Sequence, residues 1–282
     1  MEEKIFDQLG YANQNLSFTV LEKKLKETVG IRKLTVDILK VLGLYSDEEG
    51  YNNAAGLLAD HNRFSGIEIV RYGKQTNIVK EQVSAAGVSM LSQYEQALMM
   101  YQRYYQEEVI EKILREKREL VPETAFQKAV LYAITHHDWR DQSNIQIAMY
   151  DNCINIAFTG SSSFSYHPVL TSVLFHMHAI DSFDKDFQRI RVTYKNRKQI
   201  PVFESKDQMI QIILPVIDEH PDLTFTESKV YQSLDNHQLV SSSELVSSTG
   251  LSKATVIRAL NVLSNRYLVV KTGQARRTRY QI

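Results

Sequence analysis

The sequence predicts an α+β fold for this chain of 282 residues. Apolar residues recur at helical spacing in several segments, whereas shorter segments alternate apolar and polar residues as strands do. From residue 225 the pattern changes to short helices followed by two alternating segments. Because a chain of this length usually holds two or three domains, we expect three regions, 1–119, 120–218 and 219–282.

The composition is that of an ordinary globular protein, with 43% hydrophobic and 23% charged residues. Lys plus Arg and Asp plus Glu both number 33, so only the distribution of charge along the chain is informative. The single cysteine, Cys153, excludes an internal disulfide and a zinc site built on cysteines. No stretch has the roughly 18–20 apolar residues that span a bilayer, and no signal-peptide core follows Met1. We therefore expect a cytoplasmic protein without a membrane partner.

The first region, 1–119, is expected to mix helices and strands. Over residues 16–44 apolar residues at helical spacing predict two helices, and Gly30 can close the first. Small residues favour a short helix over 51–60, and alternation over 67–72 predicts a strand.

The longest helical pattern covers residues 82–119 and carries tyrosines on one face. An aromatic stripe on a helix usually packs against neighbouring structure, and we favour this role over the stacking of nucleic-acid bases. A dimerisation platform is a further role for this helix, which would make the protein a homodimer.

The middle region combines a β-hairpin with helices and closing strands. Residues 144–150 and 153–158 alternate cleanly and are separated by Asp151 and Asn152, which predicts the hairpin. The same criteria predict helices over 124–136, 169–180 and 183–194 and strands over 202–204 and 209–214.

The last region has the pattern of a helix-turn-helix. Thr226 can cap a first helix, and the serine run beginning at Ser241 can cap a second. Gly250 lies in the turn that follows, and Ser252 can cap a third helix over 253–263.

In that third helix, Val256, Leu260 and Leu263 recur at i, i+4 and i+7 and are expected to face inward. Polar residues of its N-terminal half then lie outside, as in a recognition helix that enters the major groove. Residues 267–270 and 278–282 alternate like two strands around a basic tip. The sequence therefore predicts a winged helix-turn-helix.

Charge is distributed unevenly over this region. Residues 219–250 carry five acidic residues and one basic residue, whereas residues 251–282 carry seven basic residues and no acidic one. An acidic scaffold followed by a basic recognition element is typical of phosphate binding. A winged helix used only for protein contacts is the alternative, but such modules usually lack a concentrated basic wing.

We therefore expect double-stranded DNA as the partner, and the residues that would bind it are Ser252, Lys253, Thr255, Arg258, Lys271, Arg276, Arg277 and Arg279.

Two resemblances narrow this interpretation. The last sixty residues resemble bacterial winged-helix regulators. The motifs YNNAAGLLADHNRF, IEIVRYGK, AFQKAVLYAITHHDW and NIQIAMYDNCINIAFTG resemble bacterial proteins named transcriptional regulators or ATP-dependent DNA helicase-related proteins. This second resemblance is scattered over residues 10–218. It implies a degenerate ATPase domain of the GHKL class over 120–218, an α/β sandwich, and a Schlafen/AlbA-type DNA-binding domain that we expect this chain to lack.

The departures from that family argue against an enzyme. The resemblance places Lys128 and Tyr132 where the family carries a glutamate base and a magnesium-binding asparagine. A lysine cannot accept a proton at pH 7, and a tyrosine cannot replace a hard amide ligand. The phosphate-binding sequence GxxxxGK[ST] is absent from the chain. We expect a catalytically dead scaffold without a cofactor, and an ATP-dependent DNA-processing protein as the alternative.

No catalytic or metal-binding set is expected elsewhere. His136 and His137 are adjacent at the end of a predicted helix, so their side chains point about 100° apart and one ion cannot easily bind both. The sequence identifies no operator and no small-molecule effector.

Overall fold

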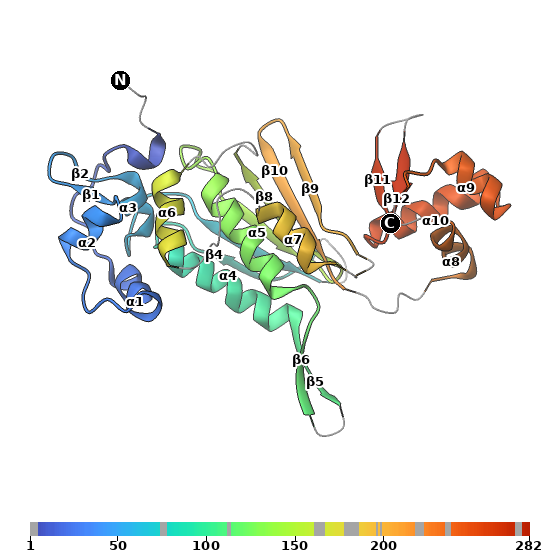
Figure 1. Ribbon diagram of the computed structural model, residues 1–282, viewed down its shortest axis with the longest axis horizontal. Helices are drawn as coiled ribbons and strands as arrows, with labels where there is room; N and C mark the ends of the chain where they lie inside the picture. The colour runs from blue at the N-terminus through green and yellow to red at the C-terminus, as the bar shows by residue number, and fades with distance from the viewer. Residues whose placement is uncertain are drawn as a thin grey trace.

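The computed structural model confirms an α+β fold (Figure 1). It describes residues 5–73, 78–111, 114–160, 167–177, 186–195, 197, 199–217, 223–234, 238–273 and 278–282. A small helical unit lies at one end, a six-stranded sheet with helices on one face forms the middle, and three helices with a two-stranded hairpin form the other end. None of the helices within these ranges is long and apolar enough to cross a membrane.

The N-terminal unit is held together by a few buried leucines and by capped helices. Leu21 and Leu25 are buried on the inner side of the first α-helix, which closes at Gly30, where φ is 77°. Its elements are η1 (Phe6–Gln8), α1 (Thr19–Thr28), α2 (Val36–Val41), β1 (Tyr45–Ser46), β2 (Gly50–Tyr51) and α3 (Asn53–Leu58). The two helices predicted over 16–44 and the short helix predicted over 51–60 are thus confirmed.

The central sheet has the strand order β4-β3-β7-β8-β10-β9. All neighbours pair antiparallel except β3 and β7, which run parallel. The predicted hairpin is confirmed as β7 and β8, joined across Asp151 and Asn152. The strands are β3 (Ile67–Tyr72), β4 (Val79–Ser84), β7 (Ile145–Met149), β8 (Cys153–Thr159), β9 (Val202–Lys206) and β10 (Met209–Pro215).

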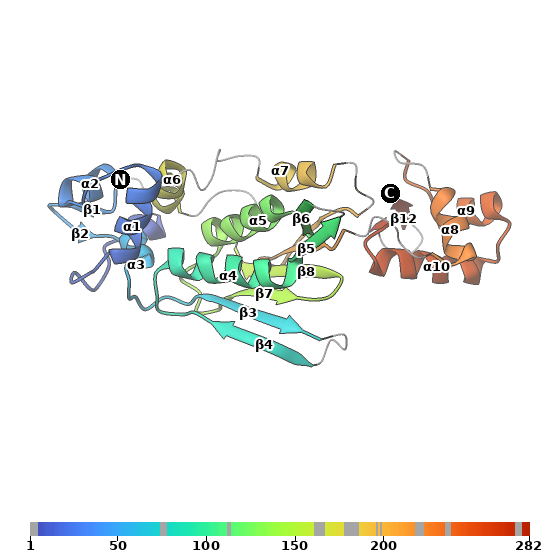
Figure 2. The ribbon, with the colours of Figure 1, turned by 90° about the horizontal axis from the view of Figure 1, so that it is seen from below.

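Helices cover one face of this sheet, as the view from below shows (Figure 2). Ile147, Ile156 and Ile212 are buried on the covered face, where adjacent strands bring them into register. Phe126, on the helix that crosses them, is fully buried as well. The helices of this middle part are α4 (Met90–Tyr105), α5 (Glu123–His136), α6 (Pro168–His176) and α7 (Asp186–Thr193).

The single long helix predicted over 82–119 is wrong. Residues 79–84 form strand β4, helix α4 ends at Tyr105, and an antiparallel hairpin of β5 (Gln106–Glu111) and β6 (Leu114–Glu119) follows. Tyr101 is fully buried and stacks on Phe126, whereas the hairpin beyond Tyr105 projects away from the sheet (Figure 1). A helix continued beyond Tyr105 would have no surface to pack on. Cross-strand hydrogen bonds between β5 and β6 satisfy the backbone of this segment instead.

The boundary expected at residue 119 lies inside one hydrophobic core. That core extends from Leu21 to Ile217, because β3 and β4 join the same sheet as β7 to β10. The parallel pairing of β3 with β7 brings together segments about 80 residues apart, and no local pattern announces such a contact. A separate core extends from Val230 to Tyr280.

This second core belongs to the C-terminal unit. It consists of α8 (Phe225–Gln232), α9 (Ser242–Thr249), α10 (Lys253–Asn265), β11 (Val270–Thr272) and β12 (Arg279–Gln281), the order of elements in a winged helix. The first wing strand begins at Val270 rather than at Tyr267, which has a positive φ of 55° in the turn after α10.

Candidate functional site

The helix-turn-helix of the C-terminal unit is defined by its caps. Ser241 and Glu244 form a capping box at the start of α9, and Gly250 ends that helix in the left-handed conformation with φ 67°. Ser252 Oγ then accepts the backbone N–H of Thr255, which starts α10 directly after the turn. These three positions match the sequence-based expectation, because caps depend on residues only a few positions apart.

The cap expected for α8 is wrong by two residues. Thr224, and not Thr226, precedes the helix. Its hydroxyl accepts a hydrogen bond from the backbone N–H of Glu227, and the Glu227 carboxylate accepts one from the backbone N–H of Thr224. The pattern Thr-x-x-Glu at 224–227 is the signal that would have found this cap.

Helix α10 buries one face and exposes the other. Val256, Leu260 and Leu263 are fully buried against α8 and α9, as the spacing predicted. Lys253 and Arg258 are exposed on the outside of the helix, and Ser252 is exposed at its N-terminus. The helix thus presents two cations on its exposed face, near an N-terminus whose dipole favours an anion.

Thr255 occupies a different environment from the other expected contact residues. It is half-buried, and its hydroxyl lies 2.7 Å from Ser252 Oγ. Its side chain therefore takes part in the cap at the start of α10, whereas Lys253 and Arg258 project outward.

Further exposed side chains of α10, among them Ile257 and Asn261, were missed from the sequence. Ile257 is 37% exposed and Asn261 is exposed, one and two turns after Lys253. Counting i+4 and i+8 from Lys253 would have found them. An exposed amide and an apolar side chain between cations are suited to base edges, since amides hydrogen-bond to bases and apolar groups contact thymine methyls.

The two basic wing residues that the structure describes, Lys271 and Arg279, differ in exposure. Lys271 is exposed on β11, next to exposed Thr272. Arg279 on β12 is half-buried and donates to the carbonyl of Thr278 at 3.2 Å. The hydrogen bonds from Ser241 hold the pKa of Glu244 below its usual value, and the nearby charge of Arg279 adds to this. The charge of Arg279 thus offsets part of the negative charge of Glu244 in the first turn of α9.

The remaining two expected wing residues, Arg276 and Arg277, lie outside the described residues.

The C-terminal unit contacts the sheet at the far end of α10. Tyr267 donates its hydroxyl to Cys153 Sγ at 3.3 Å, and Asn152 Nδ2 donates to the carbonyl of Asn265 at 3.4 Å. Burial raises the pKa of the Cys153 thiol, so the thiol stays protonated near neutral pH. The N-terminal half of α10, with Lys253 and Arg258, is at the opposite end of the helix from this contact.

The middle part was expected to hold a remnant of a nucleotide site around α5. Tyr132 is 8% exposed, stacks on His136 with ring centroids 3.8 Å apart, and meets Phe158 and Phe203 edge-on. The tyrosine ring thus belongs to the aromatic core between α5 and the sheet. Lys128 is half-buried one turn earlier on the same helix.

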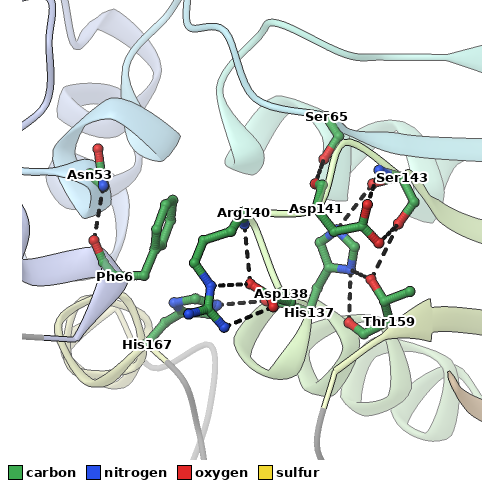
Figure 3. Close-up of polar contacts among 10 residues, drawn as sticks. All are labelled: Phe6, Asn53, Ser65, His137, Asp138, Arg140, Asp141, Ser143, Thr159 and His167. Carbon is green, nitrogen blue, oxygen red and sulfur yellow. Dashed lines mark hydrogen bonds and ion pairs between the residues drawn. The ribbon is translucent and has the colours of Figure 1, made fainter. Parts of the chain in front are cut away.

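The corner after α5 is packed through buried histidines (Figure 3). Both ring nitrogens of His137 lie 3.1 Å from carbonyl oxygens, Nδ1 from Thr159 and Nε2 from Ser143. His167 Nε2 lies 2.6 Å from the carbonyl oxygen of His137. Asp138 accepts two hydrogen bonds from the Arg140 guanidinium at the surface. Each histidine and aspartate drawn there has a partner within the fold.

Gly160 brings the end of β8 against the end of α5. A Cβ atom at this position would lie 2.0 Å from the carbonyl oxygen of His136, so only glycine permits the approach. Gly160 N donates to the carbonyl of Gln208, and His137 pairs with Gly160 as an isolated bridge. Gly160 therefore has a packing role in this fold.

No family model and no curated protein matches the chain. Among solved structures, the chain is similar to the DIP2311 protein of Corynebacterium diphtheriae, with a TM-score of 0.66 and 14% sequence identity. The match covers 100% of this chain and 65% of that structure, so the chain spans about two thirds of its length. At this identity the likeness concerns the fold alone.

Proposed function

We propose that this chain binds double-stranded DNA through α10 and the wing and acts as a transcriptional regulator. The observation that carries the proposal is the outer face of α10, where Lys253 and Arg258 are exposed beside Ile257 and Asn261. Lys271 extends this cationic face onto β11, and residues 251–282 contain no acidic residue to oppose it. Such a face lowers the free energy of binding to phosphates by releasing counterions.

The middle part serves, in this proposal, as a scaffold that does not hydrolyse ATP. Tyr132 supports this role, because its ring is stacked in the core at the position where the resemblance expects a magnesium ligand. A neutral phenol whose ring stacks on His136 does not replace an amide carbonyl as a ligand of Mg²⁺. ATP-dependent DNA processing is the second candidate and requires that the chain bind nucleotide despite Tyr132 and Lys128.

A palindromic operator would require two copies of this chain, because half-sites mirror the two-fold axis of a dimer. We propose a homodimer on DNA, which sedimentation of the protein–DNA complex would test through its stoichiometry.

Fluorescence anisotropy of a labelled random-sequence duplex tests DNA binding, with a salt series and with or without ATP and magnesium. We expect affinity to fall steeply with salt, and Arg258→Ala to make the slope of log K against log salt shallower by about one unit. Lys229→Ala is the matched control, since Lys229 is an exposed cation of the same unit that belongs to a different helix, α8. It should leave the slope unchanged.

Three results would count against the proposal. Absence of binding at low salt would demote the C-terminal unit to a protein-contact module. If the Lys229 and Arg258 substitutions changed the salt slope equally, α10 would not be the DNA-binding interface. A change of affinity on adding ATP and magnesium would favour the ATP-dependent alternative.

A further inference from the structure

A partly enclosed cavity of about 130 Å³ lies where four helices meet. Its walls come from α1, α4, α5 and α6, so it joins the N-terminal unit to the helical layer over the sheet. Protein interiors are packed as densely as organic crystals, with few voids larger than a water molecule. A void of this size at such a junction costs the fold packing contacts that larger side chains could have supplied.

Most of the residues that line the cavity are apolar. They include six almost fully buried side chains, Met90, Leu91, Leu131, Ile134, Leu174 and Met177. A cavity lined in this way does not hold water well, because water needs two to four polar partners. Methionine adapts its shape and has a polarisable sulfur, which suits aromatic and irregular ligands.

Four polar residues complete the lining, namely Lys24, Thr28, Tyr94 and Glu95. Lys24 and Glu95 form an ion pair there, with 2.6 Å between Nζ and the carboxylate oxygen. Their side chains are 31% and 40% exposed, which marks where the cavity reaches the surface. Lys24 Nζ also lies 3.8 Å from a carboxylate oxygen of Glu27, so the entrance offers no unpaired cation to a ligand. A carboxylate head group would meet Glu95 as well as Lys24.

We propose that this cavity is a binding site for a small neutral apolar group, such as a single aromatic ring or a short branched alkyl chain. Its volume is close to that of cavities of about 150 Å³ that stay dry and bind benzene. The site does not depend on the proposed DNA binding. Occupancy would add contacts between α1 and the helices α4 to α6, and so would stabilise the junction of the two parts.

Methyl NMR of the full chain labelled at methionine tests the site with toluene as the probe. The chain has seven methionines, and two of them, Met90 and Met177, line the cavity. We expect ring-current shifts at these two methyl groups that saturate with toluene concentration. Met99 and Met209 are exposed elsewhere and should not shift. Unselective shifts, or none up to the solubility of toluene, would overturn the proposal.

Filling the cavity provides a second test. Leu98 lines the cavity and is only partly buried, so Leu98→Trp should occupy the space and weaken toluene binding at least tenfold. Met99→Trp is the matched control, because Met99 is the next residue of α4 and is exposed on its other side. It should change the affinity less than twofold. Leu98→Phe replaces the tryptophan variant if that variant does not fold, and unchanged toluene affinity in the filled variant would contradict the site.

Benzoate tests the expected neutrality of the ligand. It has the same ring as toluene but carries a carboxylate, which Glu95 would repel at the entrance. We expect benzoate to bind at least tenfold more weakly than toluene. Tighter binding of benzoate would overturn the neutral-ligand class and would assign Lys24 as an anion-binding residue instead.

Discussion

Two buried ionisable residues meet at the start of α6 and respond to pH in opposite directions. Burial lowers the pKa of His167 from 6.5 to about 4, and burial raises the pKa of Asp7 from 3.8 to about 6. Asp7 accepts the N–H groups of Val169 and Leu170 at 2.8 and 3.1 Å, so it also caps α6 from a distant segment. His136 and His137 are buried nearby, and burial lowers their pKa values as well.

The folded state resists protonation of His167, so its contribution is full above pH 6.5 and is lost as the pH falls toward 4. Asp7 is favoured in its protonated form, so its contribution is lost as the pH rises through 6 and returns on acidification. Each shift corresponds to roughly 3 kcal/mol in the free energy of unfolding. The two effects oppose each other between pH 6 and 4.

We expect two variants to separate these effects in urea unfolding at pH 7 and pH 5. His167→Phe should gain stability on acidification relative to the wild type, because His167 then no longer offsets the Asp7 effect. Asp7→Asn should lose stability over the same range, because the histidine effect is no longer offset. The readout is the change with pH and not the absolute stability, since both substitutions remove contacts. Equal pH dependence in all three proteins would contradict the assignment.

At the scale of elements, local signals set the starts of α9 and α10, whereas the end of α4 involves a contact with a distant segment. The caps at Ser241 and Ser252 lie within three residues of the groups they bond. At the end of α4, by contrast, the hydroxyl of Tyr105 donates to the carbonyl of Tyr150, in the turn between β7 and β8, at 2.6 Å. Such a contact joins residues 45 positions apart and leaves no periodic signal.

The cap of α10 can be measured by Ser252→Ala. We expect it to lower the free energy of unfolding of the C-terminal unit by about 1 kcal/mol, since it leaves the Thr255 N–H without its acceptor. Ser243→Ala within α9 is the control, because Ser243 is exposed in the first turn of that helix and is not its capping residue. Thermal unfolding followed by circular dichroism provides the comparison. A control variant as unstable as Ser252→Ala would show that the cap does not matter.

The whole molecule is built on two separate cores. The larger core extends from Leu21 to Ile217, and the smaller one from Val230 to Tyr280. Between them, the described hydrogen bonds are those of Tyr267 with Cys153 and of Asn265 with Asn152. Contacts of this kind contribute little compared with the burial of either core.

We therefore expect calorimetry of the full chain to resolve two unfolding transitions. The smaller core should unfold at the lower temperature, because it buries far fewer apolar side chains. Tyr267→Phe removes the hydroxyl that contacts Cys153. It should change the free energy of unfolding in the first transition by less than about 1 kcal/mol. If both cores unfolded in a single transition, the expectation of independent unfolding would be contradicted, and the junction would be shown to couple the two cores.

The sequence by itself determined the features that depend on near neighbours. The β7–β8 hairpin, the buried side of α10, the turn at Gly250 and the charge contrast within the C-terminal unit all follow from patterns a few residues long. The exposure of Ile257 and Asn261 could have been predicted in the same way, because they follow Lys253 at helical spacing.

Only the tertiary structure decided the features that join distant segments. The parallel pairing of β3 with β7 placed the N-terminal and middle regions in one core, and the burial of Tyr132 removed it from any solvent-facing site. The cavity beneath Lys24 and Glu95 likewise needs four helices from separate parts of the chain. Periodicity shows which side of an element is buried, but it does not show which partner buries it, because many partners satisfy the same apolar face.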